Sequence, residues 1–191
     1  YQMACERVAA AGLQDRVTLL KQDYRELSGQ FDKLVSVEMI EAVGHRYYQT
    51  YFRQCSALLK PEGLMLIQAI TIADQRYEAA SETMDFIQKY IFPGGALPSV
   101  AVIASHVAED TDMQIVGLED ITLHYARTLE AWRDRFLHRI DEVKALGFDD
   151  VFVRMWEFYL AYCEGGFMER VIGTSQILMA KPGCRELPAV G

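Results

Sequence analysis

The stretch GLMLIQAITI, residues 63–72, limits what this chain can fold into more than any other. It is an almost unbroken apolar run of strand length, as a parallel strand covered on both faces requires. A strand-like segment at 31–40 (FDKLVSVEMI) and an amphipathic helical segment at 47–60 precede it. Strands that alternate with helices in this way indicate strand–helix–strand units. The sequence up to residue 72 therefore predicts half of a doubly wound α/β sheet.

The rest of the chain continues the alternation with longer helical segments. Near the N-terminus we expect a helix that ends at Gly12, followed by a short strand at 17–23 (VTLLKQD). The later segments predict helices over 75–92, 98–110, 125–145 and 149–169, and strands over 113–121 and 174–182. We expect residues 1–182 to belong to a single domain and residues 183–191 to form a frayed tail.

Composition excludes several classes of function. The chain has 191 residues, of which 51% are hydrophobic, enough for one domain with a sizeable core. Its net charge of -8 and its lack of Lys or Arg runs argue against a nucleic-acid partner. The four cysteines are widely separated and no metal-ligand spacing occurs, so we expect reduced thiols and no metal site. The sequence shows no signal peptide or bilayer-spanning run, which predicts a cytoplasmic location.

Polar residues gather where the predicted strands end. Asp23, Glu38, Glu41 and Gln68 all fall at or near the carboxyl ends of strands. In a doubly wound sheet, ligands bind at this edge. The alternative for each acid is an exposed loop or helix-start residue, which the helix dipole would favour. Four such residues at one edge favour a binding site.

Five motifs in order carry a family resemblance. They are QDYREL, FDKLVSVEMIEAVGH, YIFPGGALPS, HYARTLEAW and FYLAYCEGGF. Together they resemble the cyclopropane-fatty-acid synthase family, which includes the mycolic acid cyclopropane synthases, over residues 1 to about 182. The resemblance implies a class I S-adenosylmethionine-dependent methyltransferase fold, Rossmann-like, with helical insertions that bind an acyl chain.

The resemblance also bears on the cofactor. Family members carry a glycine-rich cofactor loop after a first strand, and the chain has no such loop, so we expect a fragment that lacks two strands and is by itself inactive. Of the cofactor site, the resemblance leaves Asp23 and Tyr24 beside the adenine of S-adenosylmethionine. Asp23 as an ordinary turn residue is the alternative.

The active-site residues follow from the same resemblance. Glu41 and Tyr125 match the family's catalytic glutamate and tyrosine, and Gln68 and Ile70 lie in the triplet QAI, where the family usually has a histidine first. The resemblance implies that Glu41, Gln68, Ile70 and Tyr125 hold a bicarbonate ion beside the acyl double bond. Bicarbonate would accept a proton from the carbocation that methylation creates. Glutamine can donate a hydrogen bond to an anion but cannot carry positive charge. The alternatives are therefore that bicarbonate still binds or that the carbocation has another fate, which gives a methylene or methyl branch.

The predicted reaction is methylene transfer to an unsaturated phospholipid acyl chain, giving a cyclopropane fatty acid. A methyl-branching lipid methyltransferase, a non-catalytic lipid-binding relative and a small-molecule methyltransferase are the alternatives. Peripheral contact with the membrane and the oligomeric state stay open.

Overall fold

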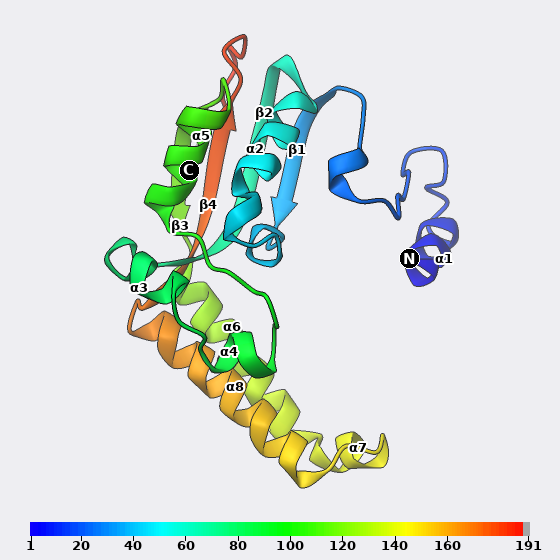
Figure 1. Cartoon of the computed structure of the whole chain (residues 1–191). Helices are drawn as coiled ribbons and strands as arrows, with labels where there is room; N and C mark the ends of the chain where they lie inside the picture. The colour runs from blue at the N-terminus through cyan, green and yellow to red at the C-terminus, as the bar shows by residue number, and fades with distance from the viewer. Residues whose placement is uncertain (189–191) are drawn as a thin grey trace.

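The strands of the sheet follow the order β1-β2-β4-β3 in the computed structural model, which describes residues 1–188 (Figure 1). They are β1 (Phe31–Val37), β2 (Leu59–Ile72), β3 (Gln114–Asp120) and β4 (Ile172–Ala180). β1 pairs with β2 in parallel, and β4 runs antiparallel to both β2 and β3. Parallel neighbours need a crossover, which α2 (Tyr48–Ala57) supplies between β1 and β2. This α/β arrangement agrees with the predicted fold class.

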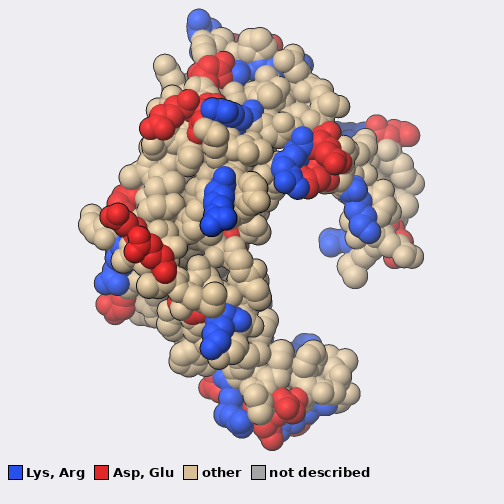
Figure 2. All heavy atoms as spheres, in the orientation of Figure 1, with Lys and Arg blue, Asp and Glu red and all other residues tan. Residues whose placement is uncertain are grey.

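Four of the helices form two packed pairs, α2 with α5 (Val100–Asp110) and α6 (Thr122–His138) with α8 (Asp150–Met168). The other α-helices in the described part of the chain are α1 (Gln2–Ala10), α3 (Tyr77–Ser81), α4 (Phe86–Tyr90) and α7 (Ile140–Ala145). Helices α2 and α5 pack on one face of the sheet, whereas α6 and α8 pack on each other beyond its lower end (Figure 1). The molecule is a crescent with α1 at one end and α7 at the other, hollowed between them (Figure 2).

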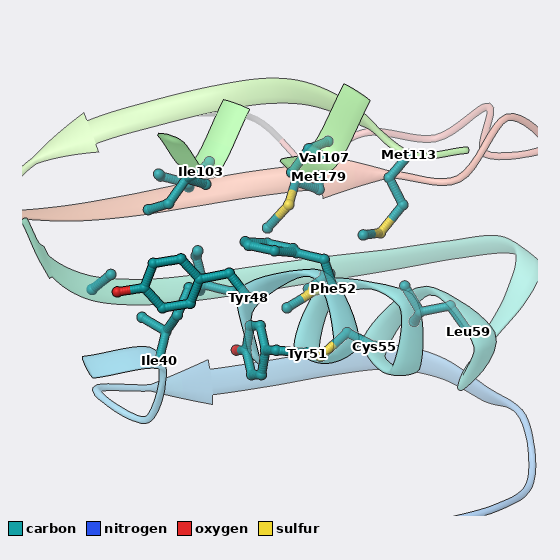
Figure 3. Packing of buried hydrophobic residues seen from close by; sticks show 14 residues of the cluster. Ile40, Tyr48, Tyr51, Phe52, Cys55, Leu59, Ile103, Val107, Met113 and Met179 are labelled. Atoms are coloured by element: carbon teal, nitrogen blue, oxygen red, sulfur yellow. The ribbon is translucent and has the colours of Figure 1, made fainter. Parts of the chain in front are cut away.

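The core lies between β2, β4 and helices α2 and α5 (Figure 3). Along β2, Met65, Ile67 and Ala69 are buried at two-residue intervals, as side chains on one face of a strand must be. Phe52 of α2 is likewise fully buried against them. The intervening residues of β2 from Leu66 onward are only half-buried, and Ile70 among them packs against the cluster between α6 and α8, so the second face of this strand is covered only in part.

Two predicted elements differ in the structure. Residues 17–23 form no strand: they are irregular, and Leu20 is exposed. A strand needs a partner for its backbone groups, and no described strand lies beside this segment. The predicted helix over 75–92 divides into α3 and α4 because Asp85 starts a new helix with a capping box to Gln88.

The other predicted boundaries shift by a few residues. The strand predicted over 31–40 ends at Val37, and the helix predicted over 125–145 divides at Arg139 into α6 and α7. The last part of the predicted tail, residues 189–191, lies outside the described residues. Within the described part, no helix combines the length and apolar character needed to cross a bilayer.

Candidate active site

Three elements meet at the carboxyl ends of β1 and β2. Glu38 directly follows β1, and its backbone N–H donates to the carbonyl of Gln68 on β2 at 2.8 Å. Glu41 lies in a single 3-10 turn (Ile40–Ala42) just beyond. Tyr125, in the first turn of α6, comes from the helical layer. The edge predicted from the sequence thus brings together side chains from three separate parts of the chain.

A hydrogen-bonded network surrounds the carboxylate of Glu38. Gln68 donates through Nε2 to Glu38 Oε1 at 2.9 Å, and the hydroxyl of Tyr125 donates to Glu38 Oε2 at 2.7 Å. Gln68 Oε1 in turn accepts from Nε2 of Gln176 on β4 at 2.9 Å. The ring of Tyr125 stacks on Phe167 of α8, with ring centroids 4.8 Å apart. The network therefore links β1, β2, β4 and α6 through one carboxylate.

Glu41 makes a separate set of contacts. Its Oε1 accepts the backbone N–H of Ile70 at 2.5 Å, and its carbonyl accepts the N–H of Ala96 at 2.7 Å. Its Oε2 is buried and has no hydrogen-bond partner within the described structure. Burial, followed by the nearby charge of Glu38, raises the pKa of Glu41. A buried carboxylate oxygen with no partner is uncommon and points to a functional position.

Tyr125 is held as a proton donor. Burial raises its pKa well above the usual range, and its hydrogen bond to the Glu38 carboxylate acts in the same direction. The phenol therefore stays protonated at neutral pH, and its O–H points to Glu38.

The residues predicted to hold one anion lie at the same edge of the sheet, but they contact two different glutamates. Tyr125 and Gln68 both contact Glu38, whereas Ile70 contacts Glu41. The sequence placed Glu38 at this edge without giving it a role. The structure marks Glu38 as unusual by its backbone φ of 49°, which lies in the left-handed region that residues with a Cβ rarely adopt.

Asp23 and Tyr24 lie at the margin of a neighbouring cavity. Asp23 caps a 3-10 turn by accepting the backbone N–H of Arg25 at 3.0 Å, as the turn alternative expected. Its hydrogen bonds from Arg25, including 2.7 Å from Nη2 to Oδ2, lower the pKa of Asp23 to about 2. These residues line a cavity of about 380 Å³ together with Met39 and Val43. An ionised carboxylate beside apolar side chains suits a ligand with both a polar edge and an apolar face.

The described residues at this edge do not form a metal-binding cluster. In residues 1–188, no group of three or more His, Cys, Asp or Glu side chains is placed to hold an ion.

Comparison with known proteins locates the chain among lipid-modifying methyltransferases. Residues 1–177 match the family described as mycolic acid cyclopropane synthetase. The chain is 47% identical over 182 residues to the tuberculostearic acid methyltransferase UfaA1 of Mycobacterium tuberculosis, covering 95% of this chain and 43% of that protein. It is 39% identical over 165 residues to the cyclopropane-fatty-acyl-phospholipid synthase of Escherichia coli K12, covering 86% of this chain and 41% of that protein.

A solved structure agrees with the fold. The mycolic acid cyclopropane synthase CmaA1, complexed with SAH and CTAB, superposes with a TM-score of 0.76 at 26% identity. The match covers 85% of this chain and 59% of that one. The chain therefore spans less than two thirds of the length of each of these three proteins.

Proposed function

Because the chain belongs to the mycolic acid cyclopropane synthetase family, we propose that the whole protein transfers a methyl group from S-adenosylmethionine to the double bond of an unsaturated fatty acyl chain of a lipid. The observation that carries this proposal is the pair of carboxylates, Glu38 and Glu41, set beside the Tyr125 hydroxyl at the carboxyl edge of the sheet. Negative charge of this kind suits a reaction that creates positive charge on an apolar chain.

The cavity beside Asp23 supports a cofactor role for its lining residues. S-adenosylmethionine supplies an electrophilic methyl group when bound. Asp23 remains partly exposed, and a carboxylate has about four lone-pair sites, so contacts with Arg25 leave it able to accept from an adenine amino group. Met39 and Val43 offer apolar contact to the face of a base. These residues fit one side of the cofactor.

Bicarbonate fits the site less well than the resemblance implies. The groups expected to donate hydrogen bonds to that anion are the side chains of Gln68 and Tyr125 and the backbone N–H of Ile70. Gln68 and Tyr125 already donate to Glu38, and the N–H of Ile70 already donates to Glu41. A free bicarbonate would have to displace two carboxylates of the chain itself, so no step of the proposed reaction is assigned to it.

The product is the finer part of the proposal. Loss of a proton with ring closure gives a cyclopropane, as the sequence predicts. A hydride shift onto the cationic carbon, followed by loss of a proton from the added methyl carbon, gives a methylene branch instead. The branched product is the second candidate, and one observation favours it: the relative that is 47% identical is named a tuberculostearic acid methyltransferase, whereas the cyclopropane synthase is 39% identical.

Contact with a lipid surface belongs to the same proposal. The tip of the helical arm, where α7 meets α8, carries Leu146, Phe148 and Val151 with 78%, 45% and 61% of their surface exposed. Apolar side chains gathered at one end of a molecule are typical of a binding surface. This tip offers a route by which the protein reaches lipid substrates.

Fatty-acid profiling of cells that express the intact gene tests the proposed reaction. Mass spectrometry should show unsaturated chains that gain one carbon, and proton NMR should separate cyclopropane protons from methylene protons. Glu41→Gln should abolish the gain, and the matched control Glu62→Gln, at an exposed glutamate near the start of β2, should not. If no lipid gains a carbon, the acyl-chain reaction is wrong, and a lipid-binding role or a small-molecule substrate replaces it.

A further inference from the structure

Glu38 occupies a backbone position that ordinarily suits glycine. Its φ of 49° is shared by few non-glycine residues of the chain: among those described, only Arg170 also has a positive φ. A Cβ is disfavoured in this conformation. The neighbouring contacts must therefore hold it there, and both oxygens of its side chain do receive hydrogen bonds from the site.

The carboxylate of Glu38 is chemically close to bicarbonate. Both present two oxygens that share a negative charge, and both accept hydrogen bonds from amide and hydroxyl groups. In this chain, Gln68 and Tyr125 donate one hydrogen bond to each oxygen of Glu38, at 2.9 and 2.7 Å. The side chain thus uses the very donors that a bound bicarbonate would need.

Resting on the proposed function, we propose that Glu38 is a resident carboxylate that replaces bicarbonate in the active site: it stabilises the positive charge that forms on the acyl chain and accepts the proton that the chain loses. The chain then needs no external anion for this step. Glu38 is, in this role, a catalytic residue that the family resemblance does not assign.

The proposed step balances. The electron pair of the double bond forms the new carbon–carbon bond to the methyl group, and the departing sulfur keeps the pair of the broken carbon–sulfur bond. Positive charge then lies on the adjacent chain carbon. A proton leaves the newly added methyl carbon for an oxygen of Glu38. The electrons of that carbon–hydrogen bond close the ring on the cationic carbon or, after a hydride has moved onto that carbon from the methyl-bearing one, form the double bond of a methylene branch. Glu38 finally returns the proton to solvent, and no oxidant or reductant is consumed.

Glu38 is better suited to this role than Glu41. One oxygen of Glu41 is tied to the backbone N–H of Ile70, and its other oxygen is buried. Glu38 is only half-buried, and each of its oxygens has a lone-pair site beyond the one that Gln68 or Tyr125 uses. It therefore keeps the capacity to receive a proton.

Two substitutions separate this proposal from a structural role. Glu38→Gln keeps the size of the side chain and removes its charge and basicity. Glu38→Gly removes the side chain, suits the positive φ, and leaves room for an anion beside Gln68 and Tyr125. Glu62→Gln is the control for loss of a carboxylate elsewhere, because Glu62 is exposed.

The experiment measures release of S-adenosylhomocysteine by the full-length enzyme on unsaturated phospholipid vesicles, in buffer freed of carbon dioxide and again with added bicarbonate. We expect the unmodified enzyme to keep its rate without bicarbonate and Glu38→Gln to lose about 100-fold or more in both buffers, the size of effect typical of a general base. Glu38→Gly should be equally slow without bicarbonate and should regain activity when it is added. A structural role would not produce rescue by an anion.

Three outcomes would overturn the proposal: loss of the unmodified enzyme's activity without bicarbonate, full activity of Glu38→Gln, or no rescue of a folded Glu38→Gly variant. Binding of carbon-13 bicarbonate, followed by NMR without any substrate, tests the replacement independently. We expect saturable binding only in Glu38→Gly, and binding to the unmodified protein would contradict the proposal. If no unsaturated lipid is methylated, the proposed function fails, and this binding measurement still decides whether Glu38 takes the place of the anion.

Discussion

At the scale of single residues, the two glutamates after β1 differ in what their oxygens contact. Glu38 receives hydrogen bonds from two side chains, whereas Glu41 receives one from the backbone and keeps a buried oxygen without a partner in the described structure. Sequence alone places both at the carboxyl edge of the sheet. It does not assign their partners, because these depend on a left-handed turn at Glu38 and on α6, which follows about 80 residues later.

Burial of Glu41 makes stability depend on pH. The pKa of Glu41 in the folded state is raised above the ordinary 4.5 of the unfolded state. At a pH between the unfolded and the folded pKa, the folded state therefore binds more protons than the unfolded state. The free energy of unfolding should therefore fall as pH rises through this window and stay lower above it. Urea unfolding of the full-length protein across acidic to neutral pH should show that Glu41→Gln removes this fall. An identical pH profile in Glu41→Gln and in the exposed control Glu62→Gln would contradict the assignment.

The Tyr125 hydroxyl should stabilise the fold through Glu38. Tyr125→Phe leaves the stacked ring in place but removes the donor to a half-buried carboxylate, which we expect to cost about 1–2 kcal/mol. Tyr162→Phe is the matched control, because Tyr162 also stacks on a phenylalanine, Phe158, with centroids 5.8 Å apart, yet is 45% exposed. Chemical denaturation should show little change for the control. Equal losses would mean that the hydrogen bond adds nothing.

At the scale of elements, local signals predicted the strands and helices that bury a face. The apolar runs at 31–40 and 63–72 became β1 and β2 because each found a partner strand. VTLLKQD at 17–23 also contains a short apolar run, but no described strand lies beside it, so its strand propensity is not realised. The break between α3 and α4 was missed although Asp85 and Gln88 have capping-box spacing, because helical periodicity continues across it.

The start of α8 depends on one cap. Asp149 accepts the backbone N–H of Phe152 at 2.9 Å, which satisfies a donor that the helix itself cannot. Asp149→Ala should lower the free energy of unfolding by about 1 kcal/mol, whereas Asp149→Asn keeps an acceptor oxygen and should cost only a few tenths. Thermal and urea unfolding compare the two. Equal destabilisation would show that the charge at this position matters rather than the hydrogen bond.

At the scale of the whole molecule, the crescent separates the candidate chemistry from the candidate contact with lipid. The two glutamates lie at the end of the sheet, and the arm formed by α6 and α8 carries α7 away from it (Figure 1). Charged side chains of both signs surround the tip of this arm (Figure 2). Leu146 and Phe148 are exposed in the segment between α7 and α8, and Phe148 stacks on Phe152 with ring centroids 4.2 Å apart. This arrangement resembles an interfacial anchor more than a buried helix junction.

Binding of the full-length protein to vesicles tests that anchor. Leu146→Asp places a charge where an apolar side chain would enter the lipid surface, and the loss of one buried leucine corresponds to about a tenfold weaker partition. Neutral phosphatidylcholine vesicles avoid repulsion of the added charge by anionic lipid. Met84→Asp is the matched control, because Met84 is 74% exposed, close to the 78% of Leu146, but lies between α3 and α4 rather than at the tip. Co-sedimentation should fall for Leu146→Asp alone. If both variants bind as well as the unmodified protein, the tip does not enter the lipid, and the acyl chain must reach the glutamates by another route.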